Sequence, residues 1–443
     1  MNIKPTYWRI FSIAGPIMLF MFVQNLIALT DMIFLGRVGI VEYSACGLMS
    51  TFYLFLLMIG FGISRGAQIL IARRVARKNY DAVGKIVDQL FIIEMGLALL
   101  LFLFVQFASQ YVLPLFVQDN AIYLAGWEYL DWRSYGIFFS LFGFVLLALY
   151  SGIGNVTVII YVAIVMAISN IFLNYSLIFG AWGFPAMGIA GAGLASSIAE
   201  GLAAVVGIIY IARDSWRTKL NLFKFKSLPT KTLRRLTEIS TPLVLQNMVG
   251  VGGWFAFIAF IENMGQNALA ISVTIKGVYT FFSIPSWGLA SAVNSVVSNL
   301  IGQGKYKGAL LGIRKAVILS VVSTAACCLL LVFFPEWVTS IFSDVPEIIT
   351  GSAKLLWLLI VILMCCSISV VVHNFLMGAG AVKEALYIET ISIFIYMVYA
   401  YSVINHYDKG LSWAWASELV YWGLLLIFTW LYLRRGTWRN HEL

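Results

Sequence analysis

Hydrophobic runs long enough to cross a bilayer follow one another along almost the whole chain, with short polar segments between them. A membrane-spanning helix needs about 20 predominantly apolar residues. Runs of that length predict spans at residues 10–34, 44–71, 86–110, 121–149, 156–179, 187–212, 238–262, 266–301, 310–334, 347–376, 386–405 and 411–433. We therefore expect an all-α polytopic membrane protein with twelve transmembrane helices.

The composition excludes several other classes of protein. Only 11% of the 443 residues are charged and 61% are hydrophobic, whereas a soluble domain carries about 25% charged residues. The net charge of +9 comes from loops between apolar runs, so it does not predict a nucleic-acid partner. The sequence has no GxxxxGK[ST] nucleotide loop and no catalytic constellation. We expect a protein that is not an enzyme and needs no cofactor, and we interpret its five cysteines as packing residues.

Basic residues also predict the orientation in the membrane. Most of the 29 lysines and arginines fall in loops on the side of the two chain ends, including the long polar stretch 214–237. Loops rich in lysine and arginine stay in the cytoplasm. The charge pattern therefore places both termini in the cytoplasm, in a multi-pass protein of the cell inner membrane that contacts the lipid bilayer.

The two halves of the sequence are related. An ungapped shift of 226 residues pairs Pro16 with Pro242, and it also pairs four glycines of the first half, Gly39, Gly62, Gly152 and Gly154, with Gly265, Gly288, Gly378 and Gly380. Prolines and glycines mark bends and turns, so these matches indicate shared backbone geometry. We expect a six-helix lobe at 1–213, a basic linker at 214–237 and a second lobe at 238–443. Two such parallel repeats predict bundles around a central V-shaped cleft.

One intramembrane acid breaks the repeat. Asp31 is paired with Phe257 by the shift, and a lone carboxylate at the bilayer centre costs about 2.5–3.5 kcal/mol. Gln24 lies two helical turns before Asp31 on the same helix face, and Pro16 is expected to kink that helix. This arrangement favours a site for a proton or Na⁺ at Asp31, the alternative being a capping or interfacial residue.

Further polar residues lie within the predicted spans. Asn170 and Asn174 share one helix face and either complete the site of Asp31 or bond neighbouring helices. Glu128 and Asp131, with Arg133, either pair with one another or line an outward-open cleft.

Lys276 either snorkels to the surface or belongs to a substrate cavity, for which Gln246 and Asn247 are further candidates. Glu94 lies deep in its span, Asp88 lies at the cytoplasmic interface, and we interpret His373 as a packed side chain rather than a proton relay.

Several motifs together resemble those of one transporter family. Pro16, Gln24 and the stretch TDMIFLGRVG at 30–39 resemble the first helix of the multidrug and toxic compound extrusion (MATE) family. The stretch NIFLNYSLIFGAWGFPAMGIAGAGLAS at 170–196 is similar to its fifth-to-sixth helix pattern, and YSGIGNV and FLMGAGAVK are similar to its paired glycine turns. The resemblance covers essentially the whole chain.

The resemblance implies an H⁺- or Na⁺-coupled antiporter that exports small organic compounds, cationic or amphipathic, by alternating access and as a monomer. It assigns the coupling site to Asp31 and Asn170, with Asn174 where many members have an aspartate. It adds Tyr129 and Gln24 to that site.

A second ion site used by some members is expected to be absent here. That site has a glutamate where this chain has Gly250 and an aspartate near Cys366. Lys276 sits oddly in a cavity for cations. A flippase for lipid-linked precursors, of the same architecture, is therefore the alternative, and a non-transporting membrane scaffold or receptor is a third reading.

Overall fold

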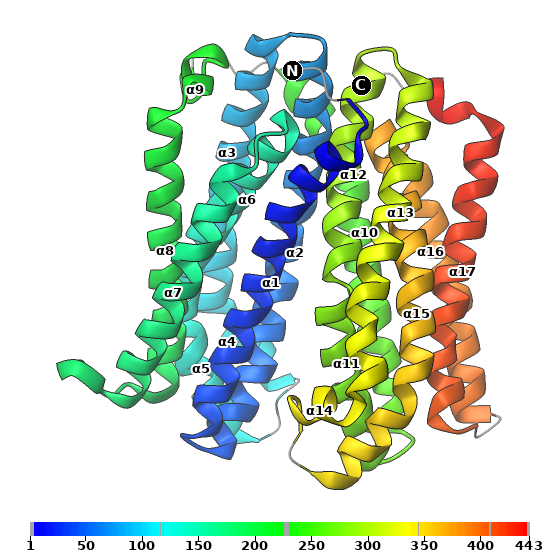
Figure 1. Ribbon diagram of the computed structural model, residues 1–443. Coiled ribbons are helices and arrows are strands. Elements are labelled where there is room, and N and C mark those ends of the chain that lie inside the picture. Colours follow the sequence, from blue (N-terminus) through cyan, green and yellow to red (C-terminus); the bar gives the residue numbers. More distant parts are fainter. Residues whose placement is uncertain are drawn as a thin grey trace. The chain divides into compact units, whose positions relative to one another are not determined.

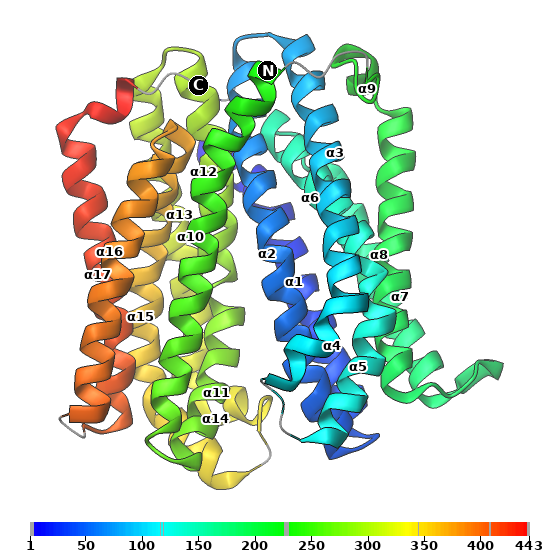
Figure 2. The ribbon, with the colours of Figure 1, turned by 180° about the vertical axis from the view of Figure 1, so that it is seen from behind.

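The computed structural model describes residues 4–115, 117, 119–225, 230–343, 345–406 and 409–440, and every regular element in these ranges is a helix. Two compact units divide the chain. We call residues 19–244 the N-terminal unit, and residues 1–18 with 245–443 the C-terminal unit. Each unit is described by itself, and Figures 1 and 2 trace the path of the chain through both.

The N-terminal unit takes its helices from the first half of the sequence. α1 runs over Tyr7–Gly36 and enters this unit at Leu19. The helices that follow are α2 (Ile40–Ala76), α3 (Tyr80–Leu103), α4 (Ser109–Val112), α5 (Asn120–Ser134), α6 (Gly136–Ile153), α7 (Thr157–Phe179), α8 (Gly188–Arg213) and α9 (Ser215–Lys219). A π-helical turn at Phe104–Ala108 joins α3 to α4.

The C-terminal unit is built in the same way from the second half. Its helices are α10 (Thr230–Glu262, in this unit from Leu245), α11 (Gln266–Phe282), α12 (Ile284–Gly302), α13 (Tyr306–Phe333), α14 (Pro335–Ser340), α15 (Pro346–Ala379), α16 (Val382–Tyr401) and α17 (Leu411–Arg435). The two labelled chain ends lie at the same end of this unit (Figure 1), as an even number of spans requires.

The number of spans agrees with the hydrophobic pattern. Among the described residues, 11 helices are long and apolar enough to cross a membrane, and the pair α11–α12 makes a further span if it is counted as one. This pair is bent by 46°, at Ser283, two residues before Pro285 in the first turn of α12. Proline has no N–H to donate and is tolerated in a first helical turn, so the chain breaks its helix there. The prediction of twelve transmembrane helices is confirmed.

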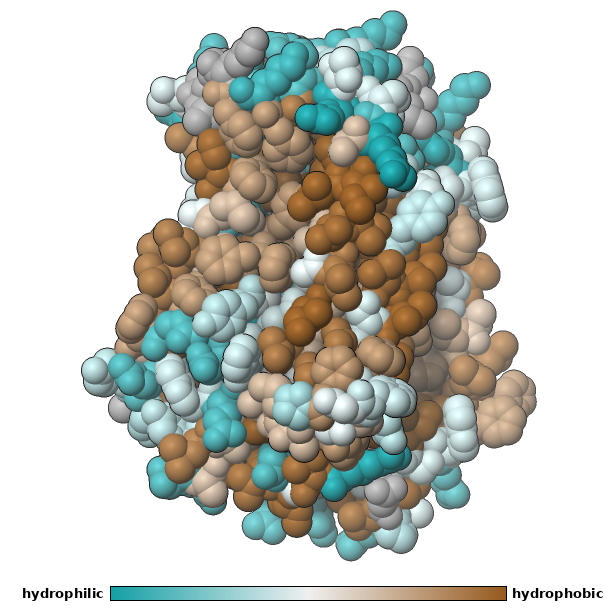
Figure 3. Space-filling view, turned by 90° about the vertical axis from the view of Figure 1, so that its left-hand side faces the viewer, coloured by the Kyte–Doolittle hydropathy of each residue, from teal (hydrophilic) through white to brown (hydrophobic). Residues whose placement is uncertain are grey.

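The surface of the molecule on the α8 side fits this assignment. Hydrophobic side chains cover much of its middle, and hydrophilic side chains gather at the upper end (Figure 3). Leu202, Val205 and Ile208 are exposed apolar residues of α8. In water such a face would be unfavourable, whereas lipid tails solvate it without cost.

Two of the glycine pairs that the repeat aligns have the same structural roles in both units. Gly154 and Gly380 end α6 and α15 with φ angles of 73° and 98°, a left-handed conformation that glycine adopts without strain. Two residues earlier, a Cβ on Gly152 would lie 3.2 Å from the carbonyl oxygen of Gln68, and a Cβ on Gly378 would lie 2.9 Å from that of Asn294. The shift that aligns the glycines also aligns these carbonyls, so both turns repeat one packing arrangement.

The division between the units differs from the expected lobes at 1–213 and 238–443. It falls after Met18 in α1 and after Val244 in α10, which are equivalent positions of the repeat, each two residues beyond Pro16 or Pro242. The first turns of α1 pack on the C-terminal unit, where Lys315 Nζ donates to the carbonyl of Pro5 at 2.9 Å. The first turns of α10 pack on the N-terminal unit, where Ser240 Oγ donates to the carbonyl of Ile63 at 3.1 Å.

The basic connector is held against α3 as far as Phe225. Asp88, only 4% exposed, accepts the backbone N–H of Phe223 at 2.7 Å and that of Phe225 at 3.0 Å. The rings of Phe223 and Phe225 pack against Phe91. Both phenylalanines have positive φ angles, a conformation that persists only where surrounding contacts fix it. Asp88 is therefore a structural anchor for the connector.

Removal of this anchor is expected to release the connector. Asp88→Ala deletes both charge-assisted hydrogen bonds, each of which contributes about 1.5–3 kcal/mol. Trypsin should then cut after Lys224 much faster than in the wild type, while the spans stay protected. Asp81→Ala removes an exposed acid of the same helix, which pairs with Lys85, and should leave the cleavage rate unchanged. Equal cleavage of wild type and Asp88→Ala would contradict this role.

Candidate functional site

Asp31 lies in the interior of the N-terminal unit, near the end of α1, and is 2% exposed. Its carboxylate accepts hydrogen bonds from two other helices. Asn174 of α7 donates to Oδ1 at 2.5 Å, Asn170 of α7 donates to the same oxygen at 3.4 Å, and Ser196 of α8 donates to Oδ2 at 2.9 Å. A buried carboxylate is tolerated when donors of this kind surround it.

The three donors are also bonded to one another. Asn170 Nδ2 donates to Ser196 Oγ at 2.9 Å, and Asn174 Nδ2 donates to Asn170 Oδ1 at 3.1 Å. All four side chains are 2% exposed or less. The spacing of Asn170 and Asn174 by one helical turn puts both amides on the same face of α7, as the sequence predicts. The result is a closed polar network around one acid.

One acceptor in this network has no partner. Asn174 Oδ1 is buried and receives no hydrogen bond from the described residues. Leaving a buried polar atom without a partner costs about 1–3 kcal/mol of folding free energy. An ion or proton that interacts with Asn174 Oδ1 therefore removes this cost, which favours its binding. A proton shared with Asp31 or a small hard cation suits a carboxylate beside amide oxygens. The described residues hold no cluster of three His, Cys, Asp or Glu side chains for a transition metal.

Two residues of the predicted coupling site bond elsewhere. The amide of Gln24 lies 3.9 Å from the sulfur of Met166, on α7 one turn before Asn170. The hydroxyl of Tyr129 lies 3.3 Å from Ser50 Oγ. These contacts put both side chains beside the network rather than on the carboxylate of Asp31.

Ser196 was not among the predicted site residues. Its only signal in the sequence is its place at the end of the small-residue stretch GIAGAGLAS, because small residues let α7 and α8 approach each other closely. Gly191, in that stretch, lies against the backbone of Leu177. Close packing of the two helices brings the hydroxyl of Ser196 to Asp31.

Arg133 resolves one alternative that the sequence left open. It does not pair with Glu128 or Asp131, as one interpretation held. Its guanidinium instead binds Glu200 of α8 through two hydrogen bonds, of 2.9 and 2.6 Å, and lies 4.0 Å from the ring centroid of Tyr53. Both charged side chains are 6% exposed. This bidentate pair joins α5 to α8, the helix that carries Ser196.

The predicted cavity residues are divided between the two units. In the N-terminal unit, Glu128 is exposed and Asp131 accepts a hydrogen bond of 2.8 Å from Gln106. In the C-terminal unit, Gln246 is buried and Asn247 is half-buried. Lys276 is also half-buried, and its ammonium lies 5.9 Å from the ring centroids of both Trp254 and Phe255. Aromatic faces attract such a cation.

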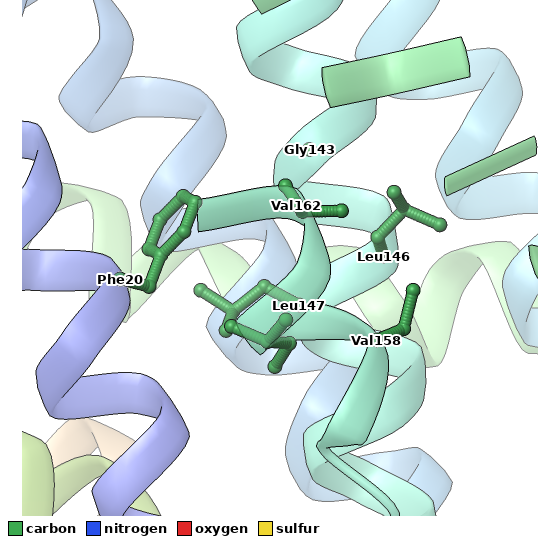
Figure 4. Close-up of a pocket in the computed structure, with 7 residues that line it drawn as sticks. Phe20, Gly143, Leu146, Leu147, Val158 and Val162 are labelled. Atoms are coloured by element: carbon green, nitrogen blue, oxygen red, sulfur yellow. The ribbon is translucent and has the colours of Figure 1, made fainter. Parts of the chain in front are cut away.

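A small apolar recess lies elsewhere in the N-terminal unit, between α1, α6 and α7. Figure 4 shows Phe20 of α1 beside Leu147 of α6 and Val162 of α7, with Leu146 and Val158 nearby. The recess offers about 10 Å³, the space of one water molecule. It is therefore too small for a substrate.

Comparison with known proteins gives a consistent result. The MatE family model matches residues 16–176 and again residues 242–402, so it repeats with the offset that pairs Pro16 with Pro242. The chain is 26% identical to the uncharacterised transporter YisQ of Bacillus subtilis over 62% of each chain. It is 24% identical to the probable multidrug resistance protein NorM of Thermotoga maritima, over 94% of this chain and 90% of NorM.

The fold also matches a solved structure. The outward-facing form of a MATE transporter of the MOP superfamily superposes with a TM-score of 0.91 and 17% identity, covering 100% of this chain and 98% of that one. These findings define a multi-pass membrane transporter rather than an enzyme. Within that class, the chain belongs to the MatE family, as the resemblance of its motifs predicts.

Proposed function

We propose that this protein is an antiporter that exports small organic compounds, cationic or amphipathic, in exchange for protons or sodium ions bound at Asp31. The observation that carries the proposal is the buried carboxylate of Asp31 beside the unpartnered Asn174 Oδ1. The name of the NorM relative, a multidrug resistance protein, supports the substrate class.

The coupling ion acts by biasing two conformations of the protein. An ion shifts such an equilibrium only by its difference in affinity for the two states. A difference of about 100-fold corresponds to about 2.7 kcal/mol, which one desolvated carboxylate provides when its donors rearrange. Asn170, Asn174 and Ser196 are the donors that change partners when Asp31 takes up its ion. Because Asp31 lies on α1 beyond Pro16, the change is transmitted along a helix with a weakened hydrogen-bond ladder.

The proposal includes a cellular setting. We propose that the protein is a monomer in the inner membrane. Both termini lie in the cytoplasm in this proposal, because the basic loops are on the side of the termini. Export then runs from the cytoplasm outward while the ion moves inward down its gradient.

The proposal is tested with purified protein in liposomes. Efflux of a fluorescent cationic dye is followed under a pH gradient alone, under a sodium gradient alone, and with neither. We expect efflux under one of the two gradients, and that gradient identifies the coupling ion. Absence of dye efflux under both gradients would contradict the proposal and favour the lipid-linked precursor flippase, which assays with a labelled lipid diphosphate then examine.

A further inference from the structure

A second buried polar cluster lies in the C-terminal unit, where four helices meet. Gln246 of α10 lies 2.7 Å from Nε2 of His373 on α15, measured from its own Nε2, and it donates to Glu389 Oε2 on α16. His373 Nε2 lies 3.3 Å from the same Glu389 oxygen, and its Nδ1 lies 3.2 Å from Thr429 Oγ1 on α17. His373 is thus bonded on both ring nitrogens.

The repeat shows that the scaffold does not need this polarity. The shift that pairs Pro16 with Pro242 also pairs Gln246 with Phe20 and His373 with Leu147, and Glu389 with Ala163. Phe20 and Leu147 line the apolar recess of the N-terminal unit (Figure 4). The same place in the fold is therefore filled by hydrocarbon in one unit and by an acid, an amide and an imidazole in the other. A purely structural role does not account for that difference.

The side-chain amide of Gln246 can hydrogen-bond to both His373 and Glu389 in only two orientations. The end group of a glutamine is either an NH₂ donor or a carbonyl acceptor, and the surrounding network decides which one occupies a given position. With the NH₂ at the bridge, His373 Nε2 and Glu389 Oε2 must both be acceptors, which an ionised carboxylate satisfies with either oxygen. With the oxygen at the bridge, both must be donors, so Glu389 is protonated. A mixed state leaves one buried contact without a hydrogen bond, which is costly.

We propose that Gln246, His373 and Glu389 form a proton-binding site in which the orientation of the Gln246 amide reports the protonation of Glu389. In the unprotonated form, Glu389 is ionised and neutral His373 carries its proton on Nδ1, which it donates to Thr429 Oγ1. Uptake of one proton leaves Glu389 neutral and the proton of neutral His373 on Nε2, with Thr429 now donating to Nδ1. The charge of the cluster changes from −1 to 0, and the side-chain amide of Gln246 rotates so that its oxygen replaces its NH₂ at the bridge.

Two titratable groups of the described residues contact the carboxylate of Glu389. They are His373 from α15 and Tyr421 from α17, whose hydroxyl donates to Oε1 at 3.4 Å. From α10, Gly250 presents no side chain, and a Cβ there would lie 3.3 Å from Oε1. The buried acid Glu418 on α17 bonds elsewhere, since it accepts from Tyr396 of α16 at 2.9 Å. The side chain of Glu389 is 12% exposed.

The site adds a second proton-responsive element to the one proposed at Asp31. It uses neither of the positions at which some family members have an acid and this chain has none, Gly250 and the neighbourhood of Cys366. Gln246 lies one helical turn after Pro242, where α10 passes from the N-terminal to the C-terminal unit. Proton uptake at Glu389 therefore changes a hydrogen bond one helical turn after the proline of that helix.

The test uses the histidines of the whole protein. The chain has three, His373, His406 and His441, so ring-¹⁵N labelling gives few signals, and His373→Gln assigns the one of interest. Spectra of the purified protein are recorded between about pH 5 and pH 8, the range in which histidines report such changes. In the wild type we expect the unprotonated ring nitrogen to change from Nε2 to Nδ1 as the pH is lowered. His406 and His441 serve as internal controls.

Two variants separate this proposal from a histidine that titrates by itself. In Glu389→Gln the proton acceptor is gone, so the pH-dependent exchange of nitrogens at His373 should disappear. In Gln246→Leu the bridge is gone, so His373 should instead become doubly protonated and pair with Glu389 directly. An unchanged titration of His373 in Glu389→Gln, or a doubly protonated His373 in the wild type, overturns the proposal. The measurement needs no substrate or gradient, so its failure is distinct from failure of the antiport mechanism.

Discussion

Asp31→Asn is expected to abolish efflux driven by an ion gradient while the protein remains folded. The asparagine keeps an oxygen that accepts from Asn174, and its NH₂ donates to Ser196 Oγ where the Asp31 carboxylate accepts from it, so that bond is reversed rather than lost. It cannot take up a proton, and it offers a cation no negative charge. We expect gradient-driven dye efflux in liposomes to fall by about tenfold or more, equivalent to at least about 1.4 kcal/mol of lost differential ion binding.

The matched control neutralises another buried acid of the same unit. Glu94 on α3 is 0% exposed and accepts a hydrogen bond from Ser64 at 2.9 Å, away from the Asp31 network. Glu94→Gln should retain gradient-driven efflux, and both variants should elute from size exclusion as the wild type does. Equal efflux by wild type and Asp31→Asn would remove Asp31 from the mechanism and direct attention to Glu94, Glu128 and Asp131.

The second large effect concerns stability. Arg133→Met leaves the carboxylate of Glu200 buried without its partner, because both of its oxygens bind the Arg133 guanidinium. Breaking a buried pair from one side costs about 3–5 kcal/mol, whereas replacing both members by apolar residues is often neutral. We expect Arg133→Met to lower the thermal midpoint of the purified protein strongly, and Arg133→Met with Glu200→Leu to recover most of that loss.

An exposed ion pair provides the comparison. Arg234 and Glu238 pair at 2.9 Å on α10, with side chains 79% and 41% exposed. Such pairs contribute little to stability because water screens them, so Arg234→Met should leave the thermal midpoint unchanged. Should the double variant at Arg133 and Glu200 unfold as readily as Arg133→Met alone, the pair would matter for its shape rather than for its charge compensation.

The spans and the repeat were predictable because each has a strong local cause. A bilayer demands long apolar runs, so their positions follow from hydropathy, and prolines and glycines mark equivalent bends. The grouping of Asp31 with Asn170 and Asn174 could also be predicted in part, since helical spacing puts the two amides on one face of a helix. The family resemblance then joined that face to Asp31, and the geometry of the structure brings the three residues together.

Partners from distant helices were not predictable in this way. Ser196, Glu200 and Glu389 act through contacts with helices far away in the sequence. In helices that are apolar nearly all round, periodicity does not show which face meets which neighbour. His373, interpreted as a packed side chain, is buried, and its partners on other helices were not predictable either. The division of the chain into its two compact units also follows from packing rather than from the loops.

The exchange of helix ends between the units has a consequence for how the protein is made. The ribosome completes residues 19–244 before the partners of residues 1–18 exist, since those partners lie in residues 245–443. Domains emerging N-terminal first tend to fold as units during synthesis. Here a segment that is synthesised before the N-terminal unit reaches its position only after that unit is complete, when Lys315 reaches the carbonyl of Pro5. Until then, the start of α1 lacks its packing partners, so the last step of assembly involves a segment that was synthesised early.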